Sequence, residues 1–138
     1  MYEKLTAFLP KLSPHHSGDW IVDTENDGSP EHPMHFPFVD YDSSSYDFES
    51  AVHTFINDHK NLGLTNYRYI LEKANIAWSS ESMKSADVAT LDGRSVMALI
   101  VGVIRADRFS EGTLAAFLES GKITEWLSRL KEIDESTR

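Results

Sequence analysis

The residues best suited to chemistry are four charged side chains that stand close together, at Arg105, Asp107, Arg108 and Glu111. We call residues 105–112, with the sequence RADRFSEG, the charged turn. Two carboxylates and two guanidinium groups at this spacing can bind an anion or perform acid–base catalysis. We take all four as binding candidates, and the two carboxylates as the catalytic candidates of an alternative reading.

The same four residues also suit a structural role, which we favour. Arg105 fits the C-terminal end of one helix, and Glu111 fits the N-terminal end of the next. Asp107 and Arg108 can tie the turn across, with Ser110 as helix cap and Phe109 anchored in the core. Structural ion-pair networks often resemble sites, so the pattern alone does not make an active site.

Metal binding is not expected. The run from Asp23 to Gly28 resembles the start of a calcium loop, but Met34 stands where the loop needs a bidentate Glu, so a turn is the better interpretation. The histidines lack the spacing of a metal site. They are His15, His16, His32, His35, His53 and His59. We predict no metal and no cofactor.

Charge excludes several partner classes. The net charge is −9. Residues 1–60 carry eleven acids against three Lys and Arg, a net of −8, whereas residues 61–138 carry eleven against ten, a net of −1. Such an acidic surface repels nucleic acid and anionic lipid. The helix–turn–helix pattern over 94–120 does not alter this, because its second helix has two Glu and no Lys or Arg.

The chain contains no Cys, which is typical of a reducing compartment. No signal peptide is visible at the start, and the longest apolar run, 96–104, is far below the ~20 residues of a membrane helix. We therefore expect a cytoplasmic protein.

Periodicity predicts an α+β fold, mostly α, in a single domain over 1–138. Five or six helices should surround a central apolar helix at about 88–105, with one small β-hairpin at about 19–41. We read 79–85 as a polar loop. The expected helices lie near 2–9, 42–61, 66–76, 88–105, 111–119 and 123–133. The core should include Leu99, Ile100, Val103, Phe117, Trp126, Leu127 and Leu130.

Several short motifs carry a family resemblance: ADVATL at 86–91, RADRFSEG at 105–112, Glu119-Ser-Gly121 and Leu127-Ser-Arg-Leu130, with a looser match in the aromatic strand at 36–41. The chain resembles a family of small bacterial proteins catalogued only as a domain of unknown function. The likeness is best over the last third. It implies a fold and no activity.

We therefore predict a non-catalytic binding or interaction module, with a protein or a second copy of the chain as partner. The alternative is a small enzyme that uses Asp107 and Glu111 with Arg105 or Arg108, and His35 as a further candidate. A fully paired turn with an exposed aromatic patch elsewhere would favour the module.

Overall fold

The computed structural model describes residues 1–12, 18–21 and 38–136. In these ranges the chain forms two strands, seven α-helices and three short 3-10 helices. They are α1 (Glu3–Thr6), β1 (Gly18–Ile21), β2 (Phe38–Tyr41), α2 (Ser43–Asp58), η1 (Lys60–Leu62), η2 (Leu64–Asn66), α3 (Tyr67–Lys73), α4 (Ser80–Lys84), η3 (Val88–Thr90), α5 (Gly93–Asp107), α6 (Thr113–Glu119) and α7 (Lys122–Ser136). The predicted fold class, mostly α with a small β part, is confirmed.

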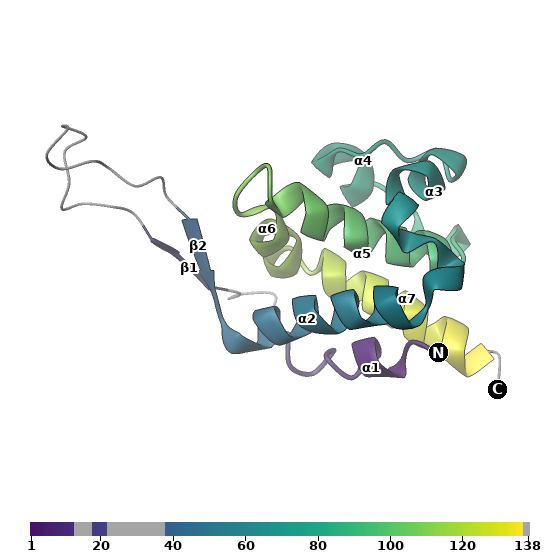
Figure 1. The fold of residues 1–138 in the computed structure, drawn as a ribbon, viewed down its shortest axis with the longest axis horizontal. Coiled ribbons are helices and arrows are strands. Elements are labelled where there is room, and N and C mark those ends of the chain that lie inside the picture. The colour runs from purple at the N-terminus through teal and green to yellow at the C-terminus, as the bar shows by residue number, and fades with distance from the viewer. Residues whose placement is uncertain (13–17, 22–37, 137–138) are drawn as a thin grey trace, which may run out of the picture.

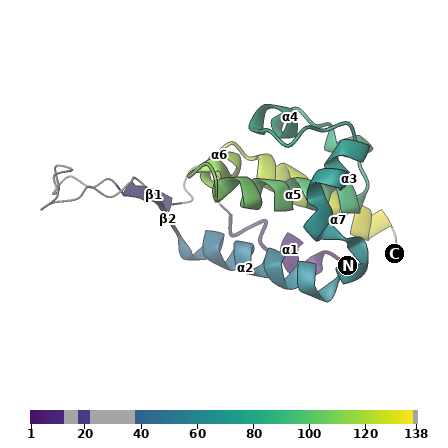
Figure 2. The same cartoon turned by 45° about the horizontal axis from the view of Figure 1, so that its top comes forward.

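Helix α5 is the centre of the molecule. Every residue from Val96 to Ile104 is buried, as the unbroken apolar run predicts. Figures 1 and 2 show α5 with α3 and α4 on one side and α7 and α2 on the other. The helix begins later than expected because Leu91 and Asp92 are extended, and Asp92 caps it by accepting from the Ser95 N–H.

The predicted core is confirmed. Seven residues chosen from the sequence are fully buried: Leu99, Ile100, Val103, Phe117, Trp126, Leu127 and Leu130. They come from α5, α6 and α7, which pack against one another. The ring centroids of Phe117 and Trp126 lie 5.4 Å apart.

One predicted loop is a helix. Residues 80–84 form α4, where Ser79 caps the first turn by accepting from the Ser82 N–H. Met83 from this helix is fully buried and lies against Gly102 of α5, where a Cβ would come within 3.3 Å of its sulfur. The single apolar side chain gave too weak a periodic signal in the sequence to predict α4.

The two strands form an antiparallel pair with the register Gly18↔Tyr41 to Ile21↔Phe38. Figure 1 shows the pair extending away from the helices. An isolated hairpin is marginally stable, so this one needs support from the helices. That support comes through β2, in which Val39 and Tyr41 are buried.

The first residues of the chain are fastened to the last helix. The carboxylate of Asp134, itself buried, accepts from the amino group of Met1 at 3.1 Å and from the Tyr2 N–H at 2.8 Å. The Tyr2 ring occupies the space beside Gly93, where an added Cβ would clash with it. The start of α5 is thus closed by α1 and α7 together.

Replacing Leu99 by Ala tests the central position of α5. Removing a fully buried Leu leaves a cavity, so we expect the free energy of unfolding to fall by about 2–5 kcal/mol in urea denaturation. Leu91→Ala is the matched control, because Leu91 is only partly buried. Its free energy of unfolding should fall clearly less than that of Leu99→Ala. Equal losses for the two variants would contradict the assignment of α5 as the core helix.

Candidate functional site

The charged turn is built around the carboxylate of Asp107, the last residue of α5. Its Oδ1 accepts three hydrogen bonds: from the Tyr41 hydroxyl at 2.9 Å, the Gly112 N–H at 3.1 Å and the Leu114 N–H at 3.0 Å. The Tyr41 oxygen in turn accepts from the Ala115 N–H at 3.1 Å. One carboxylate therefore joins α5, the start of α6 and β2.

Asp107 also caps the N-terminus of α6, a role predicted for Ser110. The N-cap of α6 is Gly112, whose φ of 92° lies in the left-handed region that glycine adopts most readily, and its own position supplies no side-chain cap. The N–H groups at the start of α6 are instead satisfied by Asp107. The prediction of a Ser110 cap was wrong because the Asp, five residues before Gly112, folds back across the turn.

Glu111 is the second attachment between the turn and the hairpin. Its Oε1 accepts from the Val39 N–H in β2 at 2.9 Å. A carboxylate that accepts from a backbone N–H forms a charge-assisted bond, which is stronger than a neutral one. Both carboxylates of the charged turn thus hold the β2 strand.

The two arginines of the turn take no part in this network. Arg105 is half-buried and Arg108 is exposed. Within residues 1–12, 18–21 and 38–136, neither forms an ion pair or donates a side-chain hydrogen bond, so the expected bonds to the last carbonyls of α5 are not confirmed. The structure brings Asp107 and Glu111 to one side of the turn and leaves both guanidinium groups available to a partner.

Phe109 corrects a second expectation. The sequence placed it in the core, but its side chain is 81% exposed. Asp107 holds the turn against α6 and β2 on the inner side. Phe109 lies on the outer side, where its ring stands nearly perpendicular to the Trp78 ring, with 6.3 Å between centroids. Apolar character alone predicted burial, whereas the path of the turn decided exposure.

Trp78 lies next to Phe109, and sequence reasoning did not select it. Its indole N–H donates to the Gly102 carbonyl of α5 at 2.9 Å, and the Arg68 guanidinium stacks 3.9 Å from its ring centroid. Tyr67 meets it edge-on at 5.6 Å. We call Arg68, Trp78 and Phe109 the Trp78 surface. The sequence signal for this residue was its position, an aromatic side chain just before the polar loop predicted at 79–85.

The environment of Tyr41 shifts its ionisation. Burial raises the pKa of the Tyr41 phenol well above its ordinary value, and the hydrogen bond to Asp107 and the Asp107 charge raise it further. The neutral phenol is the form that can donate to Asp107. Tyr41 is therefore fixed as a donor at neutral pH.

The histidine and acidic turn candidates fall mostly outside the described residues. These are His15, His16, His32, His35 and the run from Asp23 to Gly28. Of the two remaining histidines, His53 lies 3.9 Å from Glu49, and the His59 ring stacks on Phe55. In the described part of the chain, no three His, Asp or Glu side chains cluster in a way that would hold a metal ion.

Residues 2–136 match a family described as a family of unknown function, DUF6508. The chain belongs to this family. No curated protein and no solved structure matches the chain significantly. The family resemblance seen in the sequence is confirmed, and it brings no activity with it.

Among the described helices of this family member, none is both long and apolar enough to cross a membrane.

Replacing Tyr41 by Phe tests the junction between the hairpin and the helices. The variant removes a donor to Asp107 and leaves the buried Ala115 N–H without its acceptor. The free energy of unfolding should therefore fall by about 1–3 kcal/mol at neutral pH. Tyr46→Phe is the control, since the Tyr46 ring is about half exposed and its hydroxyl makes no hydrogen bond in the described structure.

The pH dependence follows from the raised pKa of Tyr41. The folded state favours the neutral phenol of Tyr41. The contribution of Tyr41 to the free energy of unfolding is therefore complete below about pH 10, the ordinary tyrosine pKa, and is lost as the pH rises toward the higher pKa of the folded state. The stability difference between wild type and Tyr41→Phe should therefore shrink at alkaline pH. A difference that stays constant through this range would contradict the Tyr41–Asp107 pairing.

Proposed function

We propose that this protein is a non-catalytic interaction module that binds another protein through the outer side of the charged turn. Arg105 and Arg108 are the contacting residues. Asp107 and Glu111 belong to the same site, but they hold its shape from the inner side. The proposal keeps the four binding candidates of the sequence and divides them by role.

The observation that carries the proposal is the use of both carboxylates as hydrogen-bond acceptors inside the fold. Asp107 accepts from three donors, and Glu111 accepts from the backbone of β2. A general base must reach the proton it removes with a free lone pair and a substrate beside it. Carboxylates that already join three elements are better suited to fixing a turn than to proton transfer.

The exposed groups supply what a protein interface uses. Phe109 is a large aromatic side chain held in the open, and the arginines beside it have no acidic partner within the described chain. Aromatic residues and Arg are enriched at the energetic centres of protein interfaces, whereas Phe is not favoured on a plain surface. The turn thus has an inner side fixed by hydrogen bonds and an outer side suited to binding a protein.

Stability measurements on two variants separate the inner side of the turn from the outer side. Asp107→Asn loses the negative charge that strengthens three hydrogen bonds, so we expect its unfolding free energy to fall by about 1–3 kcal/mol. Phe109→Ser removes an exposed ring and should change stability by no more than about 0.5 kcal/mol. An Asp107→Asn variant as stable as wild type would instead favour the enzyme, because catalytic carboxylates are often held at a cost in stability.

Binding is tested by selection from a random peptide library displayed on phage, with the full chain immobilised. Peptides enriched on wild type should bind the Arg105→Glu, Arg108→Glu double variant at least about tenfold more weakly, which corresponds to about 1.4 kcal/mol. Lys131→Glu is the matched control, since Lys131 is an exposed cation on α7. Failure to enrich any peptide, or equal binding to the double variant, would count against the module.

A further inference from the structure

We infer that the Trp78 surface docks a short acidic segment of the partner protein, with an aliphatic or aromatic residue as its anchor. The inference rests on the proposed interaction function and names the chemistry of the partner. Its basis is one preorganised aromatic and cationic surface that the charged turn completes.

The Trp78 ring is fixed from three sides. Its N–H is bonded to the Gly102 carbonyl, its face is covered by the Arg68 guanidinium at 3.9 Å, and Cδ1 lies 3.4 Å from where a Cβ of Gly102 would stand. Glycine at 102 permits this close approach of the indole to the central helix. A ring already held in place loses little conformational entropy when a ligand packs on it.

A cavity of about 350 Å³ opens beside this ring. Its apolar lining comes from Ile76, Ala77 and Trp78, and its charged rim from Arg68 and Glu72. The cavity is shallow and widely open to solvent, so it suits an apolar side chain laid against it better than an enclosed cofactor. Phe109 does not line this cavity, but its ring stands nearly perpendicular to the Trp78 ring with the centroids 6.3 Å apart, so a segment that extends from the cavity across Trp78 can contact it.

The charges around the rings determine the sign of the partner. Arg68 and Arg105 both lie on this side, because Arg105 follows Gly102 by three residues on the same face of α5. Over the ranges that the structure covers, neither has an ion-pair partner, although the whole chain carries −9. Unpaired arginines on an otherwise acidic protein are complementary to carboxylates, which Arg can bind in a bidentate manner. Glu72 is the one acid of the cavity rim, so the partner's carboxylates should lie toward the arginines.

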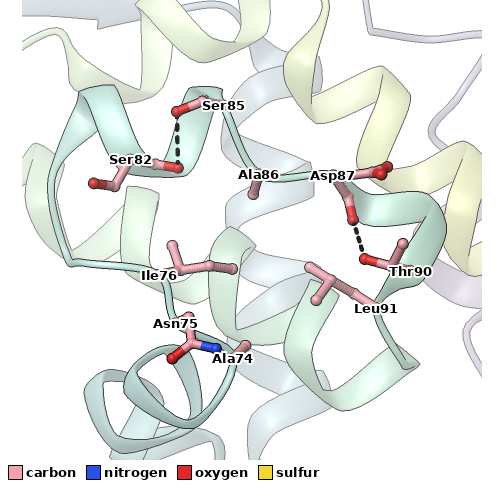
Figure 3. Close-up of a pocket in the computed structure, with 9 residues that line it drawn as sticks. All are labelled: Ala74, Asn75, Ile76, Ser82, Ser85, Ala86, Asp87, Thr90 and Leu91. Atoms are coloured by element: carbon pink, nitrogen blue, oxygen red, sulfur yellow. Dashed lines mark hydrogen bonds between the residues drawn. The ribbon is translucent and has the colours of Figure 1, made fainter.

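A second cavity shows why the ligand is a chain segment. It adjoins the first, since Asn75 and Ile76 line both, and it has a volume of about 320 Å³. Figure 3 shows Ala74, Ile76, Ala86 and Leu91 around it, while the hydroxyls of Ser85 and Thr90 bond to nearby backbone oxygens. Asn75, Ser82 and Asp87 also line the cavity and make it largely polar, so it suits a neutral polar residue of the segment, whose carboxylates lie toward the arginines. Two adjoining cavities can accept successive side chains of an extended peptide.

The backbone between the two cavities has free donors. In the described structure, the N–H groups of Ala77 and Trp78 donate to no protein acceptor. Main-chain carbonyls of an extended segment can accept from such groups, as they do when peptides bind along irregular or edge backbone. An acidic peptide therefore finds cations, an apolar cavity and main-chain donors at one place.

The test uses fluorescein-labelled synthetic peptides and the full chain, read by fluorescence anisotropy. The first peptide has aspartates on both sides of a central Leu-Phe pair. The second has Ser in place of the pair, and the third has Lys in place of every Asp. We expect the first to bind in a salt-sensitive manner and the other two to bind at least about tenfold more weakly.

Variants of the protein locate the binding. Phe109→Ser and Arg68→Glu should each lower the affinity of the protein for the first peptide at least about tenfold. Tyr69→Ser is the matched control. Tyr69, on α3, is an exposed aromatic residue like Phe109 and has a cation, Lys73, over its ring, but it does not line the cavity beside Trp78. Circular dichroism of each variant checks that the fold is retained.

The outcomes distinguish this inference from the function on which it rests. Library peptides that require Arg105 and Arg108 but ignore Phe109 and Arg68 would overturn the Trp78 surface and leave the module standing. Equal binding of the acidic and the Lys peptides would contradict the inference that the partner segment is acidic. If no peptide of either kind binds, both proposals fail. Sedimentation that shows self-association lost in Phe109→Ser would identify a second copy of the chain, and not an acidic segment, as the occupant.

Discussion

The structure depends on one carboxylate. Asp107 ends α5 and receives hydrogen bonds from the Tyr41 hydroxyl and from two N–H groups that begin α6. A single oxygen therefore fixes the angle between two helices and fastens a hairpin that would not be stable by itself. The negative charge strengthens each bond, and partial burial keeps water from competing for it. Much of the local geometry, including the exposed position of Phe109, follows from this arrangement.

The central helix provides the frame to which this carboxylate belongs. From Val96 to Ile104 every residue of α5 is buried, so the polar side chains of this helix stand at its two ends, and the Gly102 carbonyl between them accepts from the Trp78 indole. At the start, Asp92 caps the helix while Tyr2 closes over Gly93. At the end, Asp107 accepts its three hydrogen bonds, and within the described residues neither Arg105 nor Arg108 joins them. The separation of charges at the charged turn is thus a consequence of where a wholly apolar helix has to stop.

Gly102 links the core to the outer surface. Because it has no side chain, Trp78 approaches α5 closely enough to bond its carbonyl, and Met83 and Leu71 pack beside it. The tryptophan is then rigid but still partly open to solvent, with Arg68 on its face and Phe109 at its edge. A glycine in a helix interior costs about 1 kcal/mol relative to Ala. Here the close packing of three side chains offsets that loss, and the same packing positions the surface that we propose to bind a partner.

The sequence by itself determined the helical fold class, the buried faces of α5, α6 and α7 and the hairpin, because these follow from local periodicity. It also identified the charged turn as unusual. Only the tertiary structure decided what the turn does. Tyr41 and Asp107 are 66 positions apart, and no local pattern pairs them. Similarly, Phe109 is apolar and was expected inside, but whether a turn residue points in or out depends on which side the neighbouring elements pack, and that is a property of the assembled fold.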